Sequence, residues 1–202
     1  MCYLYTEPIQ DFDNLMQLSE VTFSFLDVET TGLDPEDGAR ICEIAILKTR
    51  NWQQVACFHT LVNPGIPLSD DPLPVNRITP DMLVGQPGFS EVAPEIVRLL
   101  SGSVIVCHNA PFDIGFLECE LDRAGLKLPN VQIVDTLDLA RKHYNFRNNK
   151  LGTIADSLGI ETDTRHRALT DVITTCHILR RFVEDLETKG RTTLEDIFCS
   201  SG

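Results

Sequence analysis

The chain has 202 residues, of which 43% are apolar and 23% are charged, a composition typical of one globular domain with a single core. No apolar run approaches the roughly 20 residues that a membrane helix needs, so the sequence predicts no membrane span. The formal net charge of −13 argues against tight nonspecific binding to duplex nucleic acid. It remains compatible with an enzyme that grips a few nucleotides and carries divalent metal ions.

The N-terminus shows neither the basic and apolar segments of a secretory signal nor the arginines of a transit peptide. The seven cysteines are dispersed and include no CxxC pair. This pattern predicts reduced thiols in a cytoplasmic protein rather than a disulfide framework or a zinc site. We expect an N-terminal extension at 1–20, one domain at 21–188 and a C-terminal tail at 189–202.

The first half of the chain predicts three strands, at 22–28, 40–49 and 52–62. Gly, Pro and Asp punctuate a turn at 31–38, after the first strand. A short polar turn at Arg50–Asn51 joins the second and third strands into a hairpin. The proline-rich stretch 63–89 is expected to be mostly irregular.

In the second half, strands alternate with helices. Strands are expected at 103–107 and 131–136, and helices at 90–100, 112–124, from the last strand to about 143, 151–158 and 167–187. Ser90 is expected to cap the first helix, with Glu91 in its first turn, and Gly125 and Gly159 end two others. The order predicts an α/β fold with a mixed sheet, an antiparallel hairpin plus parallel strands, flanked by helices.

Two carboxylates lie near the end of the first strand, in the stretch FSFLDVETTG. Residues two apart on a strand point to the same face, so Asp27 and Glu29 meet on one side of the sheet. Open α/β sheets bind ligands at the carboxyl ends of their strands. Two like charges held this close repel unless a cation relieves them. The alternative is a pair of solvated residues before a turn, which the apolar run FSFL makes less attractive.

A third carboxylate follows the next buried strand, in SVIVCHNAPFDIGFL. Asn109 and Pro111 suit the start of a helix, which places Asp113 in the first helical turn. If strand 103–107 neighbours strand 22–28, Asp113 faces Asp27. Taken alone, Asp113 is equally well explained as an acidic residue favoured by the helix dipole.

The fourth carboxylate lies in HRALTDVITTCHIL. His166 precedes the last long helix, and Asp171 follows five residues later. His166 is therefore positioned to reach over the site while Asp171 points into it. The alternatives are a surface histidine between Arg165 and Arg167, and an ordinary acidic residue at a helix start.

Together the three stretches carry a family resemblance. DVETTGLD at 27–34, HNAPFDIGFL at 108–117 and HRALTDV at 166–172 resemble the DEDD 3′–5′ exonucleases, in the histidine-containing branch of the epsilon proofreading subunit of bacterial DNA polymerase III. The resemblance covers roughly residues 22–187 and implies a ribonuclease H-like fold. It further implies that Asp27, Glu29, Asp113 and Asp171 hold two Mg²⁺ or Mn²⁺ ions and that His166 is the general base.

The implied reaction suits these residue types. Two divalent ions about 3.5–4 Å apart serve the attacking water and the leaving oxygen in phosphodiester hydrolysis. Carboxylate oxygens are the ligands that Mg²⁺ and Mn²⁺ prefer. A histidine with an ordinary pKa of about 6.5 accepts a proton from water near neutral pH. The expected substrate is the 3′ end of single-stranded DNA, from which the enzyme releases nucleoside monophosphates. The protein is expected to act either as a proofreading subunit, with a DNA polymerase subunit as its partner, or as a free repair enzyme.

The resemblance also points to substrate contacts, each with a structural alternative. Thr30, Thr31 and Leu33 are expected to contact the terminal nucleotide. The alternative is that the stretch from Thr30 to Gly32 only forms the turn after the strand. The second motif adds His108, Asn109 and Phe112 as expected substrate contacts. Asn109 is equally suited to cap a helix, and Phe112 is either a core residue or a surface on which a base stacks. Asp135 is expected to be structural.

One stretch outside the motifs, RKHYNFRNNK at 141–150, mixes basic and aromatic residues. Such a mixture suits a groove that follows a single strand, and it equally suits an exposed helix end. The other histidines (His59, His143 and His177) and Trp52 are expected to be packing or surface residues.

Two other classes of function remain open. An exoribonuclease of the ribonuclease T or oligoribonuclease type carries the same motifs, so the choice between DNA and RNA is open. A non-catalytic interaction module that kept the fold is the alternative from another class, and the presence of all four carboxylates argues against it. The sequence contains no P-loop or GxGxxG motif of another phosphate-handling fold.

Overall fold

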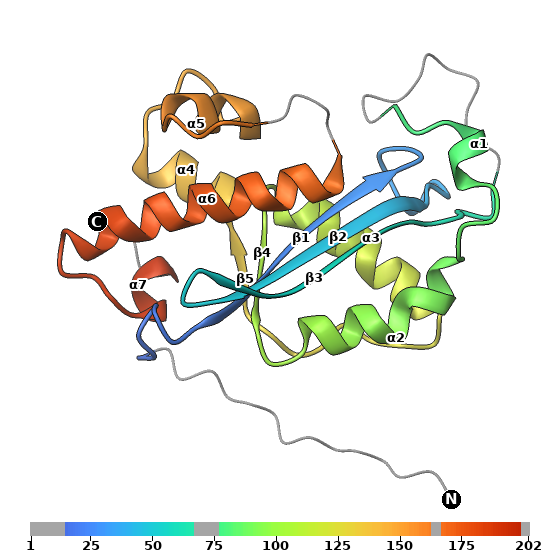
Figure 1. Ribbon diagram of the computed structural model, residues 1–202, viewed down its shortest axis with the longest axis horizontal. Helices are drawn as coiled ribbons and strands as arrows, with labels where there is room; N and C mark the ends of the chain where they lie inside the picture. Colours follow the sequence, from blue (N-terminus) through green and yellow to red (C-terminus); the bar gives the residue numbers. More distant parts are fainter. Residues whose placement is uncertain (1–14, 67–76, 163–166, 199–202) are drawn as a thin grey trace, which may run out of the picture.

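The computed structural model describes residues 15–66, 77–162 and 167–198 (Figure 1). Five strands form one mixed sheet in the order β3-β2-β1-β4-β5. They span Thr22–Thr30 (β1), Ile41–Arg50 (β2), Gln53–Leu61 (β3), Val104–Cys107 (β4) and Ile133–Asp135 (β5). Strands β1, β2 and β3 pair antiparallel, whereas β4 runs parallel to β1 and β5 parallel to β4. The predicted α/β class with a mixed sheet is confirmed.

Seven helices lie in the described residues. They span Pro80–Leu83 (α1), Phe89–Leu100 (α2), Ala110–Arg123 (α3), Thr136–His143 (α4), Leu151–Ser157 (α5), Ala168–Glu187 (α6) and Leu194–Phe198 (α7). The long helix α6 crosses one face of the sheet, and α2 and α3 cover the other face (Figure 1). None of these helices is long and apolar enough to cross a membrane, within the part of the chain that the structure describes.

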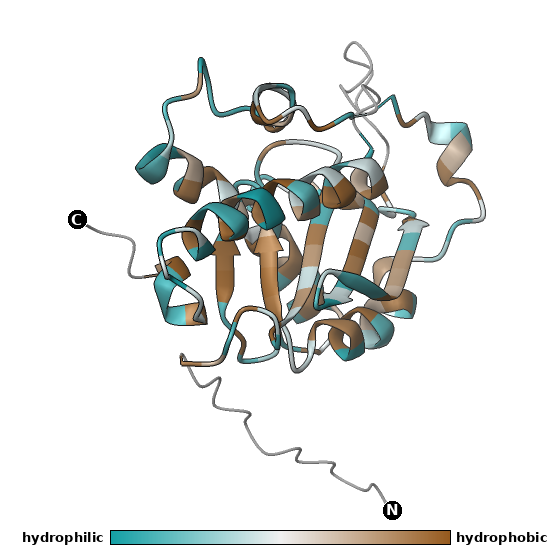
Figure 2. Ribbon diagram, turned by 60° about the vertical axis from the view of Figure 1, so that its left-hand side comes forward, coloured by the Kyte–Doolittle hydropathy of each residue, from teal (hydrophilic) through white to brown (hydrophobic). Residues whose placement is uncertain are grey.

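The alternation of side chains along β1 builds two cores, one on each face of the sheet. Phe23 and Phe25 pack under α6 with residues of α4, α5 and α7. Leu26 and Val28 point the other way and pack against α2 and α3. The strands accordingly appear mostly hydrophobic in Figure 2. Since residues two apart share a face, Asp27 and Glu29 continue the row of Phe23 and Phe25 on the α6 side.

The hairpin differs from the prediction by one residue. Its two-residue loop is Asn51–Trp52, and both have positive φ, 49° and 58°, as hairpin loops of the type I′ kind require. Trp52 therefore does not begin a strand. Its ring stacks on Phe23 with the centroids 5.5 Å apart, which confirms that it is a packing residue.

Helix boundaries were predicted within about two residues, but one predicted cap was wrong. Gly88, not Ser90, is the N-cap of α2, and its N–H donates to Glu91 Oε2 at 2.7 Å. Asn109 occupies the N-cap position of α3, yet its side chain makes no capping hydrogen bond. Gly125 and Gly159 follow α3 and α5 with φ of +71° and +69°, as expected for residues that stop helices.

Short segments next to the two ends of the domain also join the core. Leu18 and, in α7, Leu194 and Ile197 are buried under the α6 side of the sheet. Gln17 and Thr193 form an isolated β-bridge that links these two segments. The described part of the expected tail therefore includes a helix that the sequence reading did not predict.

Candidate active site

The site lies where the parallel strands end. Because β1, β4 and β5 run in the same direction, their carboxyl ends lie along one edge of the sheet. The last residues of these strands are Thr30, Cys107 and Asp135. The first turns of α3 and α6 begin beside this edge, and each carries one of the predicted aspartates. The four predicted carboxylates therefore approach one another from three elements.

Three of these carboxylates form a compact cluster. Asp27, Glu29 and Asp171 each offer a carboxylate oxygen, and these oxygens lie within 4.8 Å of one another. All three side chains are partly buried. Asp171 reaches the cluster because it lies in the first turn of α6, where its N–H donates to Arg167 O at 3.1 Å. Residues 144 positions apart in the sequence thus present like charges to the same point.

Asp113 lies next to this cluster, and a backbone hydrogen bond from β1 fixes its side chain. It is 4% exposed, and its Oδ1 accepts the N–H of Val28 at 3.1 Å. Val28 is the residue between Asp27 and Glu29, so this hydrogen bond ties the start of α3 to the strand that carries both carboxylates. Strand β4 neighbours β1, which is the condition under which the sequence predicts that Asp113 faces Asp27, and the charge of Asp113 acts on Asp27.

The electrostatics of the cluster favour a bound cation. Burial raises the pKa of Asp27 well above its ordinary value, and the charges of Asp113, Asp171 and Glu29 raise it further. Burial is also the main reason why the pKa of Asp113 rises to about 8. Carboxylates whose pKa values rise in this way are poorly solvated as anions, and a divalent cation would restore their charged form. The donor set consists entirely of hard oxygen atoms, which fits Mg²⁺ or Mn²⁺.

His166, the predicted general base, lies outside the described residues. The structure describes its neighbour Arg167, which precedes α6 and is paired with Glu43.

Glu43 on β2 is a residue that the sequence reading missed. Its side chain is fully buried on the α6 side, opposite Glu29 in the β1–β2 register. Arg167 binds it with Nη2 2.7 Å from Oε1, and His59 Nε2 lies 2.6 Å from the same oxygen. The available signal was a single carboxylate within the apolar run ICEIAIL, at a position that the strand buries.

The predicted substrate residues after β1 shape the turn. Thr30 Oγ1 donates to Gly32 O at 2.6 Å, and Thr31 forms two hydrogen bonds with the backbone of Arg40. A Cβ on Gly32 would lie 3.0 Å from the Cβ of Ala39, so a larger residue would crowd the turn. The side chain of Leu33 is 88% exposed, more than any other large apolar side chain among the described residues.

The second-motif residues have different surroundings. His108 is partly buried, and its ring nitrogens lie 2.9 Å from Thr136 Oγ1 and 3.0 Å from Asn149 O. Burial lowers the pKa of His108, so the ring favours its neutral form. Phe112 packs against Phe116 with ring centroids 4.9 Å apart, and Asn109 is exposed.

Asp135 has the structural role predicted for it. Its Oδ1 accepts the N–H of Leu137 at 2.9 Å as the N-cap of α4, and it also accepts the N–H of Asn109 at 3.0 Å. This carboxylate therefore holds the ends of β4 and β5 together.

The two aromatic side chains of 141–150 are partly buried and stack with an aromatic residue of α6. Tyr144 stacks on Phe182 of α6 with the centroids 4.3 Å apart, and on Phe146 at 5.3 Å. The Tyr144 hydroxyl donates to Asp185 at 2.8 Å. The rings pack on the core, while the basic side chains of this stretch remain exposed.

Two open hollows are lined by residues that follow β1 and β4 in the chain. One, of about 330 Å³, is lined by Thr31, Leu33 and Ile66 among others. The other, of about 500 Å³, lies beside the start of α3 and includes Asn109 and Arg141. Both are within the roughly 300–1,000 Å³ range of ligand sites.

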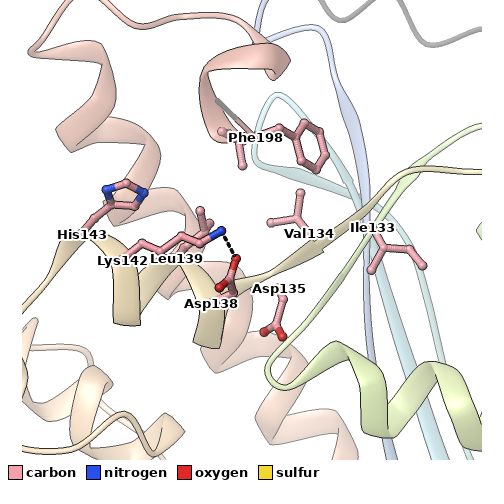
Figure 3. A pocket seen from close by; sticks show the side chains of 9 residues that line it. Ile133, Val134, Asp135, Asp138, Leu139, Lys142, His143 and Phe198 are labelled. Atoms are coloured by element: carbon pink, nitrogen blue, oxygen red, sulfur yellow. Dashed lines mark ion pairs between the residues drawn. The ribbon is translucent and has the colours of Figure 1, made fainter. Parts of the chain in front are cut away.

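A third cavity lies between β5, α4 and α7 (Figure 3). Its volume of about 150 Å³ is below that of most ligand sites. The charged pair at its mouth, Lys142 with Asp138 at 2.7 Å, is a surface i,i+4 ion pair of the helix α4.

Comparison with known proteins decides the family. Residues 24–179 match the model of the exonuclease family named RNase_T, which covers most of the chain. The chain belongs to the DEDD-type 3′–5′ exonuclease family. The predicted family membership is thereby confirmed.

Curated relatives of this exonuclease domain are much longer proteins. The chain is 38% identical over 177 residues to the PolC-type DNA polymerase III of Thermotoga petrophila, and 35% identical over 179 residues to that of Halalkalibacterium halodurans. These matches cover 87% and 88% of the chain but only 13% and 12% of the relatives.

Solved exonuclease structures share the fold. E. coli exonuclease I in complex with a dT13 oligonucleotide superposes with a TM-score of 0.71 at 20% identity, over 85% of this chain and 43% of that one. Exonuclease X in complex with 5′ overhanging duplex DNA superposes with a TM-score of 0.64 at 26% identity, over 87% and 98%. These likenesses confirm the ribonuclease H-like exonuclease fold that the sequence resemblance implied.

Proposed function

We propose that the chain is a metal-dependent 3′–5′ exonuclease that removes nucleoside monophosphates from the 3′ end of single-stranded DNA. The observation that carries this proposal is the meeting of Asp27, Glu29 and Asp171 within 4.8 Å, with Asp113 beside them. The PolC-type relatives and the DNA-bound exonuclease structures favour DNA as the substrate and a polymerase as the partner.

Asp27, Glu29, Asp113 and Asp171 would hold two Mg²⁺ or Mn²⁺ ions. Bound ions would supply an activated water and offset the charge that develops on the leaving 3′ oxygen. Burial raises the pKa of both Asp27 and Asp113, and bound cations would favour the charged form of these carboxylates. His166 would accept the proton of the attacking water, as the resemblance to the histidine-containing branch of the family implies.

Substrate contacts are proposed on both sides of the cluster. Thr30, Thr31 and Leu33 would contact the terminal nucleotide from the hollow after β1. Asn109 would contact the strand from the hollow beside α3. His108 and Phe112 would also contact the substrate, with the His108 ring oriented by Thr136 and Asn149.

The test is degradation of 5′-labelled single-stranded DNA and of the matching RNA, with Mg²⁺, Mn²⁺ or EDTA. We expect a ladder that shortens from the 3′ end of DNA in Mg²⁺ and stops in EDTA. The variant D27A should be inactive, and D122N, at an exposed surface ion pair, should retain wild-type activity. Faster cleavage of RNA would favour the exoribonuclease alternative. No cleavage of either by the folded protein with metal would favour the non-catalytic module.

A further inference from the structure

The buried carboxylate of Glu43 lies one strand away from the cluster. Glu43 is 0% exposed and points to the same face as Asp27 and Glu29. A carboxylate buried this deeply is unfavourable unless it is paired and hydrogen-bonded. Its partners therefore indicate what the position contributes.

Those partners come from the start of α6 and from the edge strand. Arg167 donates from Nη2 to Oε1 at 2.7 Å and from Nε to Oε2 at 2.9 Å, a two-point contact with fixed geometry. The N–H of Ala168 approaches Oε2 at 3.4 Å, and His59 Nε2 lies 2.6 Å from Oε1. Burial acts to raise the pKa of Glu43, but the bonds from Arg167 and His59 outweigh it and leave the pKa below its ordinary value.

Arg167 connects this buried pair directly to the cluster. It is the residue before α6, and its backbone oxygen accepts the N–H of Asp171 in the first helical hydrogen bond. A shift of Arg167 would therefore shift the turn that carries Asp171. The Glu43 side chain thus fixes, through one arginine, the position of Asp171 relative to Asp27 and Glu29.

A second buried pair on the opposite side of the sheet offers a comparison. Glu120 of α3 is 1% exposed and binds Arg40, with Nη2 2.8 Å from Oε2. Glu120 lies two turns beyond Asp113, and Asp113 is held separately by Val28. The Arg40–Glu120 pair therefore fastens α3 without touching the turn that carries a cluster carboxylate.

We propose that Glu43 and Arg167 are positioning residues of the metal site. The inference rests on the proposed function, because it assumes that the cluster binds a divalent cation. The pair orients Asp171 toward Asp27 and Glu29 and makes no contact with metal or substrate itself. Residues that orient metal ligands in this way typically change metal affinity by about 10–100-fold when they are replaced.

The test is calorimetric titration of Mn²⁺ into the double variant E43Q/R167M. This variant has the same net charge as the wild type and leaves no buried charge unpaired, so neither effect explains a change in affinity. The matched control is E120Q/R40M, which removes the similar pair on the α3 side. We expect the dissociation constant for Mn²⁺ to rise about 10–100-fold in E43Q/R167M and to stay at the wild-type value in E120Q/R40M.

Wild-type affinity in E43Q/R167M would overturn the inference. Equal losses of affinity in both double variants would also overturn it, because they would show a general effect of destabilisation. If E43Q/R167M does not fold, R167K keeps the charge but loses the two-point contact, and wild-type affinity in R167K would be equally decisive. Wild-type protein that binds no Mn²⁺, or D27N that binds it normally, would instead overturn the proposed function and with it this inference.

Discussion

Replacing Asp27 with asparagine should stabilise the metal-free protein. In the folded chain, burial and four neighbouring carboxylates raise the pKa of Asp27 well above its ordinary value of 3.8. The folded state therefore holds a proton that the unfolded chain has released, so stability is lost as the pH rises from about 4 toward the raised pKa. Asparagine keeps the shape of the side chain and removes this titration.

The size of the effect has an upper limit, because the carboxyl takes up a proton rather than staying charged. Each pH unit above the ordinary pKa is worth about 1.4 kcal/mol, so the limit at pH 7 is about 4 kcal/mol. We expect D27N to gain about 1–4 kcal/mol at pH 7 and little at pH 4. In a domain of this size, each kcal/mol raises the melting temperature by about 2–4 °C.

Differential scanning calorimetry in EDTA at pH 5 and pH 8 measures this gain. The control is D122N, whose carboxylate forms a surface ion pair with Lys127 and should matter by at most about 0.5 kcal/mol. Adding Mn²⁺ at 100 times its dissociation constant should stabilise the wild type by about 2.7 kcal/mol and D27N much less. If D27N is no more stable than D122N at pH 8, the argument that repulsion and burial of the Asp27 carboxylate destabilise the metal-free fold is refuted.

Three further outcomes test other parts of the site. H166A should lower the cleavage rate strongly and leave the Mn²⁺ isotherm intact, whereas a lost isotherm would identify His166 as a ligand. D113N keeps an acceptor for the Val28 N–H but has no titrating carboxyl at this position. Its metal-free stability, measured by urea unfolding, should therefore fall less than that of the wild type as the pH rises toward 8. Parallel curves of stability against pH for the two proteins would contradict the raised pKa of Asp113. Y144F loses the hydrogen bond to Asp185 and should cost about 1 kcal/mol without a change in activity, and a selective loss of activity would restore a role for this ring in DNA binding.

Much of the fold could be predicted because local patterns decide it. The two-residue period of β1 sends Phe23 and Phe25 to one core and Leu26 and Val28 to the other. Glycines that allow positive φ mark the ends of α3 and α5. The cap of α2 was harder to predict, because Gly88 and Ser90 are both acceptable N-caps and only the path of the backbone chooses between them. Helix α7 is too short to show a helical period, and tertiary packing of Leu194 and Ile197 stabilises it.

The candidate site divides in the same way. The spacing of Asp27 and Glu29 fixes their common face, since a strand has a period of two. The hydrogen bond from Val28 to Asp113 could not be predicted, because it joins residues 85 positions apart. The packing of Tyr144 against Phe182 likewise depends on where α6 lies over the sheet. Composition alone gave this stretch two equally good interpretations, and the contacts of its rings with α6 favour packing.

Glu43 shows why a buried carboxylate needs a tertiary partner before its role can be assigned. The same rule that drew attention to Asp27 and Glu29 applies to it, because all three interrupt apolar strands on the α6 face. A cation must offset each charge, and that cation is either a metal ion or an arginine. For Glu43 it is Arg167, 124 positions away, which the sequence pattern does not reveal. Asp27, Glu29 and Asp171 instead bring their carboxylate oxygens within 4.8 Å of one another, and this convergence separates the proposed metal ligands from the residue proposed to position them.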